Sequence, residues 1–500
     1  MTPLAARALL SVQESLLGRD TFRILRRLDP GPGPAALADV RDRDLGRLLD
    51  HAWSNIPYWR ERLGPPPAGG PGAWLARTPV LTRTEISRRR HDMLWRGGRG
   101  KVLCHRSGGT TDDNLAFFWG RGRQSWDRAM RYRGLARHGI VPGDRVLHLW
   151  PRYPAPSRAE ACKQWARDWR DRLTNDVVFD LRPLTPEALD AALDFCARYR
   201  PALVIGYPSW LAALAARRRV ARPTWRCPAL RRVMCCGEVL FDFQRRAIAE
   251  AFGVPVFEEY GSQDAGLIAH EDAAGRLRLN AEQMAVEVLR DGRPAAPGAL
   301  GEVVVTHFHT EVMPFIRYAT GDVVRQPAAA AAGPGLPAFP WPEGRTSDQL
   351  VTADGEVVPM RPVVEALVAR AGLSDFSLYQ AAPGAVTVLE VGGSGRVRGP
   401  AGDVLRAHLG RWVRVGWLTG SGFLPFTSGK RRYVCSPAAL GLLAHDREAG
   451  RARARAWPQR LIGPVAAAAP AGGRFDRSRL PPALRARLAG LRGGTDPWSD

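Results

Sequence analysis

Apolar runs and amphipathic segments alternate along the chain in a pattern that predicts an α/β fold. Strands that alternate with helices favour a parallel sheet covered by helices. GEVVVTHFHT (301–310) and the runs around it predict antiparallel strands. The short apolar runs between helical stretches are RVLHLW (145–150), PALVIGY (201–207), LRRVMCCGE (230–238) and VPVFEEYG (254–261).

Composition shifts divide the chain into three parts. Residues 1–65 predict helices that lead into a large N-terminal domain of residues 1–344, whose last stretch (329–344) is expected to be a loop or linker. A smaller α+β unit follows at 345–434. Residues 435–500 are rich in Ala, Arg and Pro and are expected to form an irregular extension.

The chain has 500 residues, of which 45% are hydrophobic and 24% are charged, as in ordinary globular proteins. Its seven Cys are scattered without paired zinc spacing, which favours a reducing, cytoplasmic compartment. The N-terminus lacks the apolar core and basic flank of a signal peptide, and no apolar stretch is long enough to span a membrane.

The formal net charge of +23 raises the alternative of nucleic-acid binding. All but three of the 72 basic residues are Arg, and they are dispersed rather than clustered on one face, which argues against this function. The three Lys are Lys101, Lys163 and Lys430. A Lys retained in an Arg-dominated chain indicates a site that needs a compact ammonium.

The segment SGGTTD (107–112) has the composition of a phosphate-binding loop. Adjacent glycines let backbone N–H groups approach a polyphosphate, and Ser and Thr hydroxyls can donate to its oxygens. It lacks the Gly-Lys-Ser/Thr of a Walker loop, and alone it is more typical of a surface turn.

The segment EEYGSQD (258–264) ends a predicted strand. Tyr260 offers a face for stacking a base, Gly261 admits a ligand near the backbone, and Asp264 offers a hard oxygen for Mg²⁺. By itself the segment also fits a strand exit with solvated acids. In FIRYATGD (315–322), the carboxylate of Asp322 could accept both hydroxyls of a ribose.

The order of these segments resembles the adenylate-forming superfamily, and specifically its phenylacetate-CoA ligase-like branch, which includes capsule-biosynthesis (CapK-type) relatives. The resemblance covers about residues 45–434 and implies a large multi-sheet adenylation domain with a small C-terminal lid domain. The supporting segments include HAWSNIPYWRERL, PVLTRTEI, IGYPSWLAALA, CCGEVL and MPFIRYATGD.

The resemblance implies an enzyme that joins a carboxylic acid to AMP, releases pyrophosphate and often passes the acyl group to a thiol. ATP and Mg²⁺ are the implied cofactors, with CoA as a candidate acceptor. Lys430 is implied as the catalytic residue and Asp264 as the metal ligand. The implied nucleotide-binding residues are Ser107, Gly108, Gly109, Thr110, Thr111, Gly237, Glu238, Tyr260, Gly261, Ser262, Asp322 and Arg345. Asp112 and Asn114 stand where the family usually has Gly and Pro.

The chemistry of Lys430 agrees with this role, because a mobile point cation can bridge a carboxylate and the phosphate oxygens that repel it. Arg345 stands at the junction where relatives rotate their lid, with Ser347 and Asp348 at the hinge. The acid is expected to be small, and the pocket candidates Trp210 and the 207–211 region are consistent with an aromatic acid. The acceptor stays open among CoA, a carrier-protein thiol, an amine and the less common nucleophiles of specialised pathways. The alternative is a degenerate member that binds nucleotide without turnover.

Overall fold

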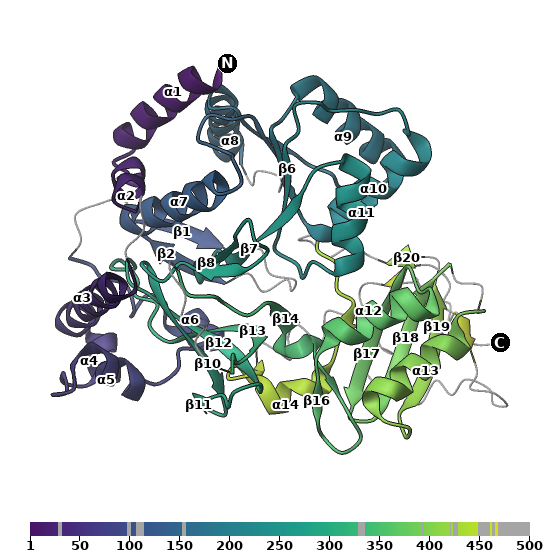
Figure 1. Cartoon of the computed structure of the whole chain (residues 1–500). Coiled ribbons are helices and arrows are strands. Elements are labelled where there is room, and N and C mark those ends of the chain that lie inside the picture. The colour runs from purple at the N-terminus through teal and green to yellow at the C-terminus, as the bar shows by residue number, and fades with distance from the viewer. Residues whose placement is uncertain are drawn as a thin grey trace.

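The computed structural model describes residues 1–28, 33–97, 102–106, 115–152, 157–328, 336–392, 395–420, 422–423, 429–448, 461–462 and 466–468. Two large sheets and the N-terminal helices form one body, and a smaller lobe with its own sheet lies beside it at the lower right of Figure 1. The mixed α/β architecture predicted from the alternation of runs is confirmed.

The main sheet has seven strands in the order β4-β3-β5-β6-β7-β8-β9. The first five are parallel, and β8 and β9 are added antiparallel. The four apolar runs predicted between helical stretches are the parallel strands β3, β5, β6 and β7. The bounds are β3 Val146–Leu149, β4 Asp176–Phe179, β5 Leu203–Gly206, β6 Arg232–Cys236, β7 Val256–Ser262, β8 Gly266–Glu271 and β9 Leu277–Leu279.

Helices cover both faces of this sheet because its central strands are apolar on both sides. Val204 and Val233 pack with helices α9 to α11, whereas their neighbours Ile205 and Met234 pack with the end of α7. Burying each such side chain contributes about 1.5–3 kcal/mol. Helix α7 Arg121–Ala136 precedes β3, and the helices that connect the parallel strands are α8 Arg158–Leu173, α9 Pro186–Tyr199, α10 Pro208–Ala221 and α11 Asp242–Phe252.

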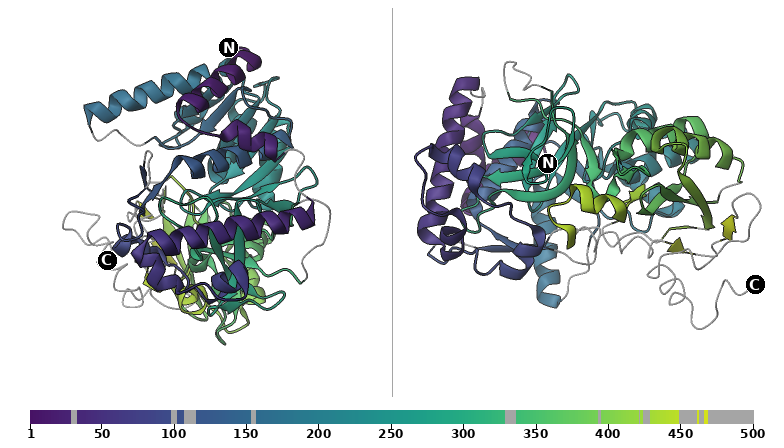
Figure 2. Two further views of the ribbon diagram at one scale, coloured as in Figure 1. Left: turned by 90° about the vertical axis from the view of Figure 1, so that its left-hand side faces the viewer. Right: turned by 90° about the horizontal axis from the view of Figure 1, so that it is seen from below.

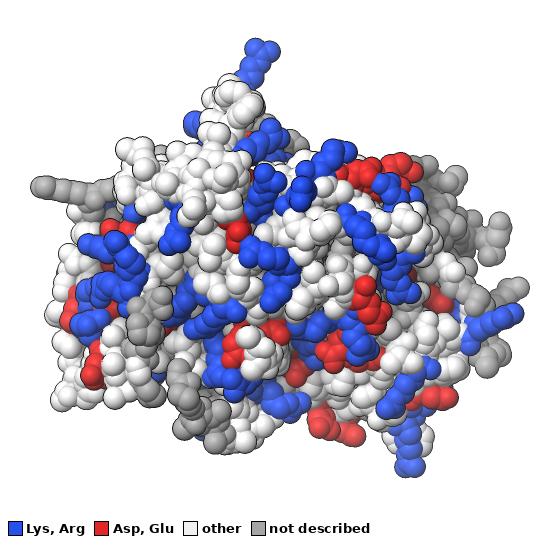
Figure 3. Space-filling view, turned by 45° about the horizontal axis from the view of Figure 1, so that its top comes forward, with Lys and Arg blue, Asp and Glu red and all other residues white. Residues whose placement is uncertain are grey.

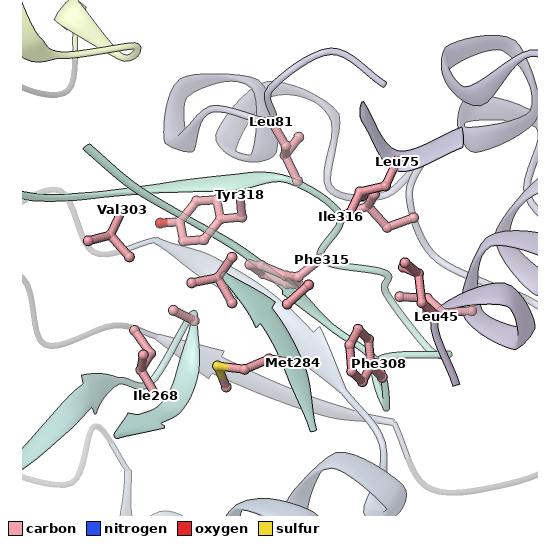
Figure 4. Packing of buried hydrophobic residues seen from close by; sticks show 14 of the residues in the cluster. Leu45, Leu75, Leu81, Ile268, Met284, Val303, Phe308, Phe315, Ile316 and Tyr318 are labelled. Carbon is pink, nitrogen blue, oxygen red and sulfur yellow. The ribbon is translucent and has the colours of Figure 1, made fainter. Parts of the chain in front are cut away.

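A second, antiparallel sheet has the order β11-β10-β12-β13-β14 and packs against the N-terminal helices. In Figure 4, Leu45 of α3 and Leu75 of α5 meet Phe308, Phe315 and other side chains of this core. The strands are β10 Met284–Arg290, β11 Arg293–Pro294, β12 Leu300–His307, β13 Tyr318–Arg325 and β14 Pro342–Arg345. The helices are α1 Pro3–Leu16, α2 Thr21–Arg27, α3 Pro34–Asn55, α4 Pro57–Leu63, α5 Gly70–Arg77 and α6 Arg83–Arg89, and a hairpin of β1 Leu103–Arg106 and β2 Ala116–Trp119 follows.

The described end of the stretch expected to be a linker, residues 336–344, belongs to the large domain instead. Leu336 and Phe339 are buried in its core, and β14 pairs with β13. The expectation was wrong here because it weighed the Pro and Gly content and overlooked the apolar side chains that can be buried between them.

The smaller lobe has a sheet of order β21-β17-β18-β19-β23 with two helices packed on it. Its elements are η1 Thr346–Asp348, β15 Leu350–Val351, β16 Val357–Val358, α12 Met360–Ala371, β17 Phe376–Ala382, β18 Ala385–Val391, α13 Arg398–Leu409, β19 Arg414–Gly420, β20 Gly422–Phe423, β21 Val434–Cys435, β22 Leu461–Ile462 and β23 Ala466–Ala468.

Between β21 and β22 the chain returns to the large domain through η2 Pro437–Ala439 and α14 Leu440–Leu443, and Figure 1 shows α14 in yellow to the lower right of β10 and β12. His445 donates its backbone N–H to Glu302 at 2.7 Å, and Asp446 accepts from the backbone N–H of Thr84 at 2.6 Å. Residues 437–446 therefore form ordered contacts between the smaller lobe and the large domain, whereas the composition of residues 435–500 had suggested an irregular extension. No helix among the described residues is long and apolar enough to cross a bilayer.

Candidate active site

The candidate site lies at the carboxyl ends of β5, β6 and β7, where ligands bind in open parallel sheets. Tyr207 follows β5, Gly237 and Glu238 follow β6, and Tyr260 stands near the end of β7. Because these strands are neighbours in the sheet, the three motifs meet at one edge.

Lys430 reaches this edge from the smaller lobe. Its ammonium nitrogen lies 5.4 Å from the centre of the Tyr207 ring. A Cβ on Gly237 would stand 2.9 Å from the Tyr207 ring, so glycine leaves room for that ring, and it would lie in ordinary contact, at 3.5 Å, with the Cε of Lys430. Burial lowers the pKa of the Lys430 ammonium, and the negative charge of Glu238 opposes that effect.

Glu238 connects the lobe to the large domain. Its carboxylate accepts hydrogen bonds from the backbone N–H and the hydroxyl of Ser209, at 3.0 and 2.9 Å, and from the backbone N–H of Arg431 at 2.6 Å. Burial raises the pKa of this carboxyl group. In this structure Glu238 therefore positions the residue that directly follows Lys430.

Trp210 holds the residue that directly precedes Lys430. Its indole N–H donates to the carbonyl of Gly429 at 2.9 Å, and its side chain is completely buried among the helices that cover the sheet. Gly429 has φ of +73°, and a Cβ there would come within 2.5 Å of the indole. The structure thus gives Trp210, a candidate for the acid pocket, a direct contact with the lysine segment.

Asp322, Tyr260 and Arg345 form a second connected group. The Tyr260 hydroxyl donates to Asp322 at 3.0 Å, and the Arg345 guanidinium pairs with the other carboxylate oxygen. Burial lowers the pKa of Arg345, but the charge and the hydrogen bond of Asp322, together with the charge of Asp264, outweigh that effect and raise the pKa. The Tyr260 ring also stacks on Phe339, with ring centres 5.7 Å apart.

Asp264 lies in a separate cluster of donors. Its carboxylate accepts from the hydroxyls of Tyr318, at 2.7 Å, and Ser262, and lies 3.4 Å from the guanidinium of Arg83. Burial raises the pKa of Asp264, but Arg83 and the two hydroxyls together lower it to about 2.

These contacts test Asp264 as a metal ligand. An ionised carboxylate suits Mg²⁺, but a guanidinium already lies beside it, and the described residues contain no group of three or more His, Cys, Asp or Glu placed to hold a metal ion. The arrangement does not fit a resident metal ion.

Gly261 has a structural reason for its small size. The register between β7 and β8 shifts between Tyr260 and Gly261, and a Cβ on Gly261 would stand 2.5 Å from the carbonyl oxygen of Gly266. The glycine thus admits the neighbouring strand, whereas the sequence suggested that it admits a ligand.

The predicted phosphate loop, with Ser107, Gly108, Gly109, Thr110 and Thr111, lies outside the described residues, as do Asp112 and Asn114. The strands on either side of it are described. β1 and β2 pair antiparallel, with Arg106 opposite Ala116, so the segment between them connects the two strands of a hairpin.

The junction residues are buried rather than exposed. Ser347 is 0% exposed and Asp348 is 6% exposed. Arg432 donates to the Ser347 hydroxyl at 2.9 Å and pairs with Asp348, while the backbone N–H of Ser436 donates to the Ser347 carbonyl at 2.6 Å. The junction is thus bound to the segment that carries Lys430.

Sequence reasoning missed the supporting residues Arg83, Ser209, Tyr318 and Arg432. Arg83 and Tyr318 stand inside PVLTRTEI and MPFIRYATGD, the segments that carry the resemblance. Their position inside these segments could have marked both residues as candidates for the site.

The fold is that of adenylate-forming ligases. No family model matches the chain. Its structure is similar to that of 2-hydroxyisobutyryl-CoA ligase in the post-adenylation state in complex with 2-HIB-AMP, with a TM-score of 0.61, 19% identity, and coverage of 82% of this chain and 90% of that one.

A second solved structure is that of the anthranilate CoA ligase AuaEII in complex with anthranoyl-AMP, with a TM-score of 0.50, 15% identity and coverage of 66% of both chains. Among curated proteins, Protein CapK of Staphylococcus aureus is 22% identical over 250 residues. That match spans 49% of this chain and 53% of CapK, so the chain covers about half the length of this relative.

Proposed function

We propose that this chain is an adenylate-forming ligase that activates a small carboxylic acid with ATP and then transfers the acyl group to a thiol such as CoA. The observation that carries the proposal is the position of Lys430, which the smaller lobe places beside Gly237 and Glu238 at the carboxyl edge of the main sheet. The similar solved ligases, which hold acyl-adenylates, support the same chemistry.

In the first half-reaction, a carboxylate oxygen of the acid attacks the α-phosphorus of ATP. A P–O bond to the acid forms, the bond to the bridging oxygen breaks, and pyrophosphate leaves. Lys430 would neutralise the charge that gathers on the reacting oxygens. Asp322 would accept the ribose hydroxyls, and Arg345, its present partner, would then be free to meet a phosphate oxygen.

In the second half-reaction, a thiolate attacks the acyl carbon and AMP leaves with the bonding electron pair. Mg²⁺ would enter with the phosphates of ATP, where it screens their charge. We place the reaction in the cytoplasm, in keeping with seven free cysteines.

The test is pyrophosphate exchange into ATP over a panel of small aliphatic and aromatic acids, followed by CoA transfer with the acids that respond. Acid-dependent exchange is expected. ATP binding without exchange for any acid would instead identify a member that binds nucleotide and does not turn over.

A further inference from the structure

Helix α8 presents its apolar side to solvent. Trp165 is 65% exposed, Trp169 is 48% exposed and Leu173 is 48% exposed, and Cys162 is exposed next to them. At 100° per residue these four side chains share one face of the helix. We call Cys162, Trp165, Trp169 and Leu173 the α8 face. None of the residues of α8 is buried.

The opposite, polar side of α8 faces the protein. Glu160, Gln164, Asp168 and Asp171 are only partly exposed. Asp168 pairs with Arg152, which precedes the helix, at 2.5 Å. An amphipathic helix of a globular protein normally packs the other way round, with its apolar stripe on the core. The inverted orientation indicates that something outside the described chain covers the α8 face.

Helix α1 buries Ala6, Leu10 and Glu14 against the protein, but it also exposes large apolar side chains at the same end of the molecule. Leu4, Val12 and Leu16 are 80%, 56% and 82% exposed and, at intervals of four or eight residues, lie along one side of the helix. The side chain of Asn175, two residues after α8, donates to the carbonyl of Met1 at 3.3 Å, which places the two helices next to each other. Figure 2 shows α8 projecting from the body near the N-terminus.

The charge around these faces is positive. Arg158, Arg167 and Arg172 of α8 are exposed and form no ion pair with any described residue. The three acids of the helix are each paired, Glu160 with Lys163, Asp168 with Arg152 and Asp171 with Arg170. In Figure 3, which turns the top of Figure 1 toward the viewer, the upper left is mainly white and blue.

We propose that α8 and α1 dock this protein on the surface of a bilayer that contains anionic lipids. Exposed tryptophans and leucines flanked by unpaired arginines match the layered chemistry of a membrane interface, where apolar side chains enter below the headgroups and cations meet the phosphates. A second copy of the chain fits less well, because pairing two α8 faces would bring like-charged arginines together. The inference is independent of the proposed reaction.

Co-sedimentation with vesicles tests the proposal. One set contains phosphatidylcholine alone and the other contains equal amounts of phosphatidylcholine and phosphatidylglycerol. The full chain is expected to bind the anionic set, less tightly at high salt. The double variant Trp165→Gln with Trp169→Gln should lower the partition coefficient at least about tenfold, since two large apolar side chains lose their burial. Trp412→Gln is the matched control, because Trp412 is 73% exposed in the smaller lobe.

A polarity-sensitive fluorophore on Cys162 gives a second readout, with Cys104, the other exposed cysteine, changed to Ser. Its emission should shift to the blue on anionic vesicles, and Cys162→Ser checks the labelling. Equal binding of the double variant, or no binding to either vesicle, would overturn the proposal. So would sedimentation of the vesicle-free chain as a dimer that the double variant abolishes, because the occupant would then be a second copy.

Discussion

The indole N–H of Trp210 donates a 2.9 Å hydrogen bond to the carbonyl of Gly429, the residue directly before Lys430. On the other side of the lysine, Glu238 accepts from the backbone N–H of Arg431 at 2.6 Å. Two groups of the large domain therefore bracket a lysine supplied by the smaller lobe. A lysine whose backbone is held in this way loses less conformational entropy when its ammonium contacts the transition state.

Trp210→Phe should lower pyrophosphate exchange by about threefold to tenfold, because it removes one hydrogen bond and keeps most of the buried ring. Acyl transfer from supplied acyl-AMP should stay near the wild-type rate. Trp225→Phe is the control, since its indole N–H donates to Leu193 at 2.8 Å inside the large domain. Equal effects of both variants on exchange would show that Trp210 acts only through stability.

Asp322→Ala should weaken ATP binding through the ribose, where charge-assisted hydrogen bonds contribute about 1.5–3 kcal/mol each. The measurement is the KM for ATP and the preference for ATP over its 2′,3′-dideoxy analogue. Tyr260→Phe removes only a donor to Asp322 and should keep most of that preference. An unchanged preference in Asp322→Ala would contradict the ribose assignment.

Ser347→Pro should impair one half-reaction more than the other, because a proline ring restricts the backbone at a junction about which the lobe would turn. The hydroxyl of Ser347 accepts from Arg432, so Ser347→Ala is needed to separate its loss from the effect of the ring. Exchange and acyl transfer are measured for both variants. Equal rates for Pro and Ala in both assays would exclude a hinge at this residue.

Four parallel strands of the main sheet, the antiparallel run at 301–310 and the order of the chemical motifs could be predicted, because apolar runs and turn residues are local signals. Tyr207, Gly237 and Tyr260 could be expected to meet, since parallel strands share an edge. The contact between Trp210 and Gly429 could not be predicted from the sequence, because it joins residues 219 positions apart through one side chain. The outward orientation of the α8 face could not be predicted either, because helical periodicity reveals an apolar stripe but not whether it faces the core or solvent.

Glu258 should make stability depend on pH. Burial raises its pKa from 4.5 to about 7, against the attraction of Arg245. The folded state therefore holds a proton that the unfolded chain has released between these values, so stability from this group falls as pH rises from 4.5 toward 7. Glu258→Gln should remove that contribution, and the stability difference between variant and wild type should change by about 3 kcal/mol across the window. Urea unfolding at several pH values measures it, and parallel curves would contradict the assignment.

Pyrophosphate exchange by Lys430→Ala tests the central claim most directly. Lys163→Ala is the matched control, because Lys163 is an exposed lysine paired with Glu160 on α8. With an acid that supports exchange in the wild type, Lys430→Ala should lose on the order of 100-fold or more and Lys163→Ala should lose nothing, since one preorganised charge is removed only in the first case. Lys430→Arg should also fail, because a planar fork does not replace a compact ammonium. Exchange by folded Lys430→Ala at the wild-type rate would contradict the account.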